Sequence, residues 1–250
     1  MRSRSWVLLA LLAGGCAGDD EPEAQGADAL GEQDKEEVAR SLGVALSRSF
    51  SSSDGLARTS VDVALGAPPA WLTEAEAGVY LGDLLGLQVD VDVSCVDVAG
   101  DPMAACGPDA DGAAITGNIE GQLSLLGWTG SLGISVGWEL AGLQGDQVQV
   151  DGSASIELGS EFEDWFQPVT HQATFTIDAE LSATLRHSDF TVVSGSAELA
   201  IEYVRARSDE GTQSRFEFTV EATVEDGEAV VTIGGVVFRI QLGDGAFIRL

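Results

Sequence analysis

The feature that most constrains the fold is a long alternation of apolar and polar residues between His171 and Leu242. A period of two places every apolar side chain on one face of a β-strand. The pattern is clearest over 173–186 and returns over 193–203 and 216–224. The sequence therefore predicts an antiparallel sheet with one dry face and one wet face. In the first segment the apolar set is Ala173, Phe175, Ile177, Ala179, Leu181, Ala183 and Leu185, and the polar set is Thr174, Thr176, Asp178, Glu180, Ser182, Thr184 and Arg186.

Similar patterns predict further strands on both sides of this stretch. The predicted ranges are 58–65, 87–98, 115–126, 128–140, 147–158 and 230–242, the last apolar on both faces and therefore expected to be covered on both sides. Asp226-Gly227 and Asp244-Gly245 are hairpin turn signals, and the short connections favour a meander over a βαβ fold. The predicted fold is mainly β, a single antiparallel meander domain of about nine or ten strands, barrel-like or sandwich.

The composition favours a sheet that packs inward over one that faces lipid. A membrane barrel shows the same alternation with its apolar side outward and needs aromatic girdles at both interfaces. The chain has two tyrosines and five tryptophans, too few for such girdles.

Two short helices are predicted before the main sheet. Val38, Leu42, Leu46 and Phe50 recur every four residues and predict an amphipathic helix that packs against the sheet. Thr73 and Glu76 form a capping-box pattern that predicts a second helix ending at Gly86. Residues 37–86 are therefore a helical neck with one short strand, and residues 87–250 are the β domain.

The first sixteen residues have the features of an export signal. Arg2 and Arg4 precede an apolar run over 6–13, which is too short to cross a bilayer, and Gly14-Gly15-Cys16 follows. This segment resembles the lipobox of bacterial lipoproteins, although Ala13 stands where that family usually has leucine. The resemblance implies that residues 1–15 are removed and that Cys16 carries the lipid. An ordinary secretory signal that leaves a free cysteine is the alternative.

In the lipoprotein family, an aspartate after the lipidated cysteine favours retention in the inner membrane. Ala17 stands there in this chain, so the resemblance implies the outer membrane of a bacterial cell envelope. Residues 16–36 are acidic and rich in small side chains, and they predict a solvated tether between the lipid and the domain.

The charge of the chain excludes one class of partner. The formal net charge is −29, and removal of the leader with its two arginines gives −29 − 2 = −31. Such a surface repels phosphate backbones, so nucleic-acid binding is not expected.

The remaining cysteines, Cys95 and Cys106, are predicted to form a disulfide, because the envelope is oxidising and the two are eleven positions apart. A metal held by this pair is the weaker alternative. In the loop that follows, Asp109 and Asp111 with Gly112 resemble the start of a calcium loop but lack its later ligands.

The rest of the chain contains no catalytic, zinc, dinucleotide or phosphate-loop motif, so no catalytic, cofactor or metal residue is assigned. His171 and His187 flank one long strand and are expected roughly 50 Å apart. The acid pairs Asp178/Glu180 and Glu217/Glu221 are expected on a solvated strand face. Three aromatics, Phe162, Trp165 and Phe166, mark a loop that is predicted to fold onto the open end of the sheet as a lid, and an entrance or contact patch is the alternative.

These features predict a non-enzymatic envelope lipoprotein, acting as a structural or interaction module without a cofactor. Its partners would be the membrane, through the lipid anchor, and an envelope protein or an apolar ligand. One alternative is a carrier that holds an apolar small molecule or lipid in a barrel lumen, which requires a closed cavity of several hundred cubic ångströms. The other is a hydrolase that uses surface carboxylates, which requires two acids in one cleft.

Overall fold

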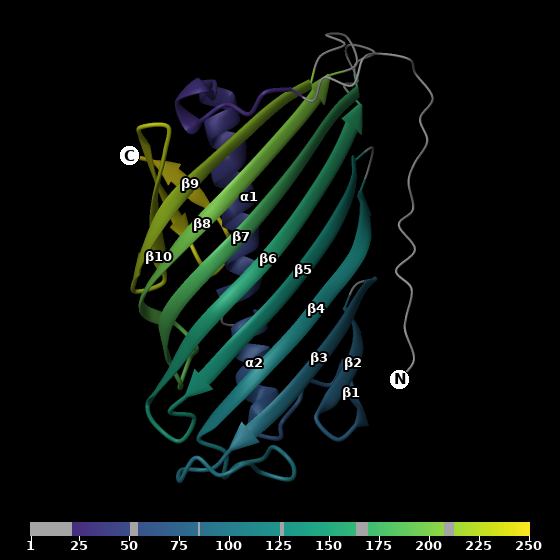
Figure 1. Cartoon of the computed structure of the whole chain (residues 1–250), viewed down its shortest axis with the longest axis vertical. Coiled ribbons are helices and arrows are strands. Elements are labelled where there is room, and N and C mark those ends of the chain that lie inside the picture. Colours follow the sequence, from purple (N-terminus) through teal and green to yellow (C-terminus); the bar gives the residue numbers. More distant parts are fainter. Residues whose placement is uncertain (1–21, 51–54, 85, 126–127, 164–169, 208–212) are drawn as a thin grey trace.

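The computed structural model describes residues 22–50, 55–84, 86–125, 128–163, 170–207 and 213–250. Its strands form one antiparallel sheet in which each strand pairs with the next along the chain (Figure 1). The strands are β1 (Leu72–Glu76), β2 (Val79–Leu84), β3 (Leu87–Val96), β4 (Gly112–Leu125), β5 (Trp128–Ala141), β6 (Gln147–Glu163), β7 (Thr170–Arg186), β8 (Val192–Arg207), β9 (Gln213–Glu225), β10 (Glu228–Ile233), β11 (Val236–Gln241) and β12 (Phe247–Arg249). The predicted single β-meander is confirmed, and the described sheet has 12 strands and is not closed, so the fold is sandwich-like.

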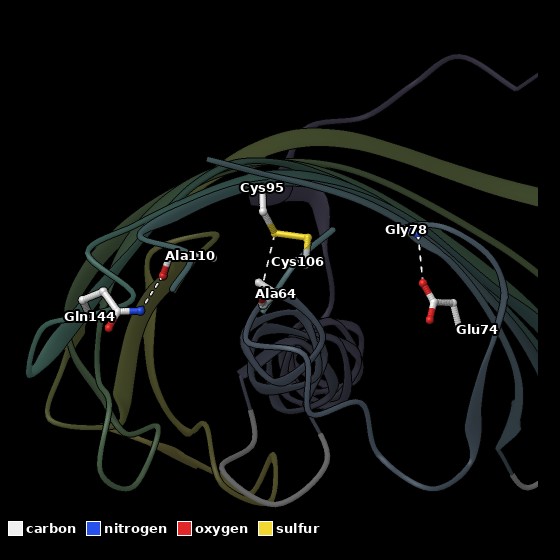
Figure 2. Close-up of a disulfide and its surroundings, with 7 residues drawn as sticks. All are labelled: Ala64, Glu74, Gly78, Cys95, Cys106, Ala110 and Gln144. Carbon is white, nitrogen blue, oxygen red and sulfur yellow. Dashed lines mark hydrogen bonds between the residues drawn. A yellow bond between two sulfur atoms is a disulfide. The ribbon is translucent and has the colours of Figure 1, made fainter. Parts of the chain in front are cut away.

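The helices occupy the concave side of this sheet. After a short 3₁₀ turn, η1 (Ala27–Ala29), come α1 (Glu32–Phe50) and α2 (Leu56–Ala64). Figure 2 shows the sheet arching over the helices, and Figure 1 shows α1 and α2 following one another along the strands. The predicted packing of the first helix against the sheet is confirmed, because Val38 and Leu42 are each 1% exposed.

The alternation of the sequence appears directly in the burial of the central strands. Phe175 and Ile177 of β7 are buried, whereas Thr176 is half-buried and Asp178 is exposed. Tyr203 of β8 stacks with Phe175 at 4.5 Å and with Phe216 of β9 at 5.7 Å between ring centroids. This aromatic row lies on the inner face of the sheet.

Two predictions for the neck are wrong. Residues 58–65, predicted as a strand, belong to α2, where Leu56, Val61 and Ala64 are spaced for one helical face and are buried. The β-branched residues of this segment suggested a strand, but tertiary packing overrides such propensities.

A helix was predicted to start at Thr73 and end at Gly86, but residues 72–84 instead form the hairpin of β1 and β2. Gly78 has φ +78° at the turn, a conformation that glycine adopts without strain. At Gly82 a β-carbon would lie 2.6 Å from the Trp71 carbonyl oxygen, so the close pairing of these strands requires glycine. The sheet therefore begins at residue 72, within the predicted neck.

The segment 230–242 is a hairpin and not one strand. Gly234 and Gly235 have φ values of +50° and +77°, as a two-residue type I′ turn requires, and they separate β10 from β11. Val231 and Phe238 face the core, while Val230 is 39% exposed, so the segment is not covered on both sides.

The part of the predicted tether that the structure describes lies on the body of the protein. Gln25 forms backbone hydrogen bonds with β9, and Leu30 is 4% exposed. Asp34 is also buried, and it forms an ion pair with Arg205 of β8. The acidic composition predicted a solvated tether, but these residues contact the body of the protein. α1 begins at Glu32, several residues before the predicted apolar stripe.

No helix among the described residues combines the length and the apolar character needed to cross a membrane.

Candidate interaction surface

Two of the predicted sites fall wholly or largely outside the described residues. Cys16 lies in the segment 1–21, and Trp165 and Phe166 lie in 164–169. Phe162 is on β6, where its backbone pairs with His171 of β7 near the end of both strands. The choice between lid and contact patch for this loop therefore stays a prediction.

The predicted disulfide between Cys95 and Cys106 is present (Figure 2). Cys95 is on the inner face of β3 and 4% exposed, and the two Cα atoms are 5.3 Å apart. The Cys95 sulfur lies 3.6 Å from the carbonyl oxygen of Ala64 at the end of α2. Because a disulfide sulfur has no proton to donate, this is a packing contact, and it joins the crosslinked loop to the helix layer.

The loop that contains Asp109 and Asp111 forms hydrogen bonds with Gln144, which lies between β5 and β6. The Gln144 side chain donates hydrogen bonds to the carbonyl oxygens of Pro108 and Ala110, both at 2.7 Å. The Gln144 backbone N–H also faces an Asp111 carboxylate oxygen at 3.4 Å. Within the described ranges, no three or more His, Cys, Asp or Glu side chains are arranged to hold a metal ion.

The two histidines lie at opposite ends of β7, as the strand length predicts. His171 pairs with Arg207 at one end, and His187 follows the strand at the other. The His187 Nδ1 is 3.1 Å from the Gly145 carbonyl oxygen, and its ring is 6.0 Å from that of Phe190. The structure therefore does not bring the histidines into one site.

The outer, convex face of the sheet carries most of the acids of β3 to β9. The outward acids are Asp90, Asp92, Glu120, Glu139, Asp151, Glu157, Glu161, Asp178, Glu180, Glu198, Glu202, Glu217, Glu221 and Glu225. On these described strands the outward cations are Arg186, which pairs with Asp189, and Arg215, which pairs with Glu202 and Glu217. We call this surface the acidic face.

Strand register brings three glutamates into one row of the acidic face. Glu180 of β7 is directly opposite Glu198 of β8, which is directly opposite Glu221 of β9. All three side chains are exposed. Like charges directly opposite each other destabilise a sheet by roughly 0.2–1 kcal/mol per pair. The row therefore costs stability unless a cation lies over it.

The acidic face has hollows at positions where the outward side chains of the strands are small. One, of about 460 Å³, is lined by Gly137, Ser153, Ser155, Asp178, Glu180 and Glu198. Two more, of about 470 Å³ and about 740 Å³, share Gln88 and Glu120 as lining residues. The 740 Å³ hollow shares Ser135 with the first, so the three adjoin across β2 to β8. The acids thus border a recessed strip with both polar and apolar lining residues.

The sequence predicted the acids of each strand but not this arrangement. Period two places Asp178, Glu180, Glu217 and Glu221 on the polar face, and all four are exposed there. Glu198 was not singled out, although it is the middle member of the row. Its position opposite Glu180 and Glu221 depends on the register of β8 with β7 and with β9, which the pattern of a single strand does not encode.

The inner side of the sheet is closely packed at two places that the structure describes. Between α2 and strands β3 to β5 the cavity is only about 10 Å³, lined by Leu56, Thr59, Val91, Ile115 and Val136 among others. At the other end of the helix layer, a β-carbon on Gly43 of α1 would lie 2.3 Å from the Gly245 carbonyl oxygen. At these two places the helices leave no space for a ligand.

Comparison of the chain with protein-family models, with curated proteins and with solved structures finds no significant match, so its fold and surface are interpreted from this chain alone.

Proposed function

We propose that this chain is a non-enzymatic lipoprotein of the bacterial cell envelope, anchored through Cys16 in the outer membrane, and that its acidic face is an interaction surface for a cationic partner. The observation that carries the proposal is the row Glu180, Glu198 and Glu221, which is exposed and in register on the outer face of the sheet. A row of like charges weakens the free sheet. A partner with lysine or arginine side chains would remove that repulsion on binding.

The recessed strip supports the same partner chemistry. Its serine and glycine floor leaves room between the acids for extended side chains, and its hollows are open to solvent. Rows of carboxylates attract lysine and arginine side chains and speed the encounter with a cationic partner. The proposed partner is therefore a basic protein or a basic peptide segment of the envelope.

The two alternative functions have less support. A carrier needs a preformed cavity of several hundred cubic ångströms, and the helix layer leaves about 10 Å³ between α2 and the sheet. A hydrolase needs one carboxyl kept protonated by an apolar, dry surrounding. Asp178, Glu180 and Glu198 meet in one hollow, but all three are exposed to solvent there.

Binding of a lysine-rich peptide to the purified protein tests the proposal. The wild type should bind the peptide with an affinity that falls as salt increases, because exposed charge pairs are screened. Glu198→Gln should weaken binding several-fold. Asp92→Asn is the matched control, because Asp92 is exposed on the same face, lies opposite Val79 and Thr116 and not another acid, and lines none of the three hollows. Equal loss in the two variants would show that net charge alone, and not the row, attracts the peptide.

The anchor is tested separately by metabolic labelling with a palmitate analogue. The wild type should take up the label, and Cys16→Ser should not. Equal labelling of the two proteins would refute lipidation at Cys16.

A further inference from the structure

The first described residues are fastened to one end of the sheet. The Gln25 N–H donates a hydrogen bond to the Arg215 carbonyl oxygen at 3.0 Å, and the Glu217 N–H donates to the Gln25 carbonyl oxygen at 2.8 Å. Gln25 thus forms a parallel bridge with Phe216 on the edge of β9. Leu30, five residues later, is buried under the helix layer. The chain is therefore held to the body from residue 25 onward.

This attachment point belongs to the end of the sheet where β8 is followed by β9. The end of β6 and the start of β7 lie at the same end, because Phe162 pairs with His171 and His171 pairs with Arg207. The opposite end carries the β3–β4 loop with the disulfide and the turn that follows β7 (Figure 1). β7 alone has 17 residues and spans roughly 50 Å at ~3.3 Å per residue. We call these the β8–β9 end and the disulfide end.

We infer that the β8–β9 end is the lipid-facing surface of this protein, so that the disulfide end is farthest from the membrane. The inference rests on the proposed anchor at Cys16. From Cys16 to Gln25 there are 25 − 16 = 9 residue steps. An extended chain covers at most ~3.5 Å per residue, so the attachment point lies within roughly 30 Å of the lipid surface. That reach is shorter than β7.

The distribution of charge favours the same orientation. At or near the β8–β9 end, arginines pair with some of the acids: Arg205 pairs with Asp34, and Arg215 pairs with Glu202 at 2.9 Å and with Glu217. Nearby, Arg249 of β12 pairs with Glu32 of α1. These ion pairs reduce the repulsion between this end and an anionic lipid surface, relative to the row Glu180, Glu198 and Glu221 of the acidic face. The sheet therefore stands upright on this end and leaves the acidic face open to partners.

Energy transfer from a dye on the protein to an acceptor on lipid headgroups tests this orientation. The lipidated full chain is placed in vesicles that contain a headgroup-labelled acceptor lipid, with the donor at position 172 or at position 188. Gln172→Cys and Ser188→Cys place exposed attachment sites at opposite ends of β7. Native thiols do not interfere, because Cys95 and Cys106 are bonded and Cys16 carries the lipid. Transfer from position 172 should be several-fold higher than from position 188.

Two variants probe the cause of the orientation. Gln25→Pro removes the N–H that bonds to β9 and should reduce the difference between the two positions, whereas Glu23→Pro, with no bond to the sheet in the described structure, should not. A twenty-residue Gly/Ser insertion after Gly18 should also reduce the difference, because it lengthens the reach. Equal transfer from the two positions, or stronger transfer from position 188, on membrane-bound wild type would overturn the orientation alone. Wild-type chain that stays in the soluble fraction would overturn the anchor and the orientation together.

Discussion

At the scale of single residues, the alternation along one strand does not determine which charges lie opposite each other on the outer face of the sheet. Each strand places its acids outward at period two, which costs nothing in an isolated strand. The cost arises between strands, where Glu198 has an acid directly opposite it on both sides. Glu157, an equally exposed acid on β6, faces Gly133 and Thr176. These two residues differ in their neighbours and not in their own strand pattern.

Glu198→Gln should therefore stabilise the free protein. Removal of one charge relieves two like-charge pairs and should raise the free energy of unfolding by about 0.5–1 kcal/mol at low salt. The gain should shrink as salt is added, because the pairs are exposed. Chemical denaturation at two ionic strengths measures the effect. Glu157→Gln should change the stability by less than about half a kcal/mol, and a gain of the same size there would refute the register argument.

Asp62 of α2 provides a pH-dependent prediction at the same scale. Burial raises the pKa of its carboxyl above the ordinary value of 3.8, although Arg58 and His187 act in the opposite direction. The folded state thus binds more protons than the unfolded state in the window between 3.8 and the raised value. The contribution of Asp62 to the free energy of unfolding is therefore greatest below pH 3.8 and is lost as the pH rises through the folded pKa. Asp62→Asn should raise the melting temperature at pH 7 and have little effect at pH 3.

Asp189 provides the matched control for Asp62. The Thr191 N–H, more than the neighbouring Arg186, lowers the pKa of its carboxyl. The pKa of Asp189 is thus shifted in the opposite direction to that of Asp62. Its contribution to the free energy of unfolding is present above the ordinary pKa and is lost as the pH falls through the folded pKa. Asp189→Asn should lower the melting temperature at pH 7 slightly. If both variants shift the melting temperature in the same direction at pH 7, net charge is the cause and not the two local environments.

At the scale of elements, the helix layer is positioned by close backbone contact as well as by apolar packing. α1 crosses the turn before β12 where Gly43 meets Gly245, and each glycine leaves no space for a β-carbon on the other. Gly245 also has φ +74°, which favours glycine at the turn. An ion pair between Asp34 and Arg205 and a hydrogen bond then orient the start of the helix, the Tyr203 hydroxyl donating to the Glu37 carboxylate at 3.3 Å. Burial, more than the Glu37 carboxylate beside it, raises the pKa of Tyr203, so its hydroxyl stays protonated and donates this bond.

Gly43→Ala should therefore destabilise the protein, although helix propensity favours alanine over glycine by about 1 kcal/mol. The new β-carbon would lie 2.3 Å from the Gly245 carbonyl oxygen, a backbone atom that cannot rotate away. Overpacking of this kind costs typically 1–3 kcal/mol. Thermal denaturation measures the loss. Val44→Ala on the same helix is the control, because Val44 is 44% exposed and its truncation should cost little. Unchanged stability of the glycine variant would show that the helix is not seated against the turn.

At the scale of the whole molecule, the fold is one curved sheet over a helix layer with a single continuous core. Apolar side chains of α1, α2 and the inner face of the sheet belong to the same buried cluster. Because the apolar side of the described sheet packs in this buried cluster, a chain of residues 17–250 should disperse in buffer alone. Two substitutions one position apart on β7 test this arrangement.

Ile177→Asp should unfold the domain or lower its melting temperature by many degrees, because Ile177 is 1% exposed and the carboxylate would be buried without a partner. Thr176→Ala, on the opposite face, should change the free energy of unfolding by less than about half a kcal/mol. Calorimetry and size-exclusion chromatography of residues 17–250 provide the measurement. Protein that disperses only in detergent, or equal effects of the two substitutions, would mean that the apolar face does not form the core.

The sequence alone determined which side of each long strand is buried, the hairpin turn at Asp226-Gly227 and the Cys95–Cys106 bond. These are local properties: period two, a positive φ at a turn and two cysteines a short loop apart. Only the tertiary structure decided that 56–64 is a helix and 72–84 a hairpin, because short apolar segments fit either pattern until their partners are present. Tertiary pairing also decided that Glu198 stands between two acids and that Gln25 is bound to β9. Register and docking depend on contacts between residues far apart in the chain, and a local pattern of polar and apolar residues carries no information about which distant strand will lie opposite.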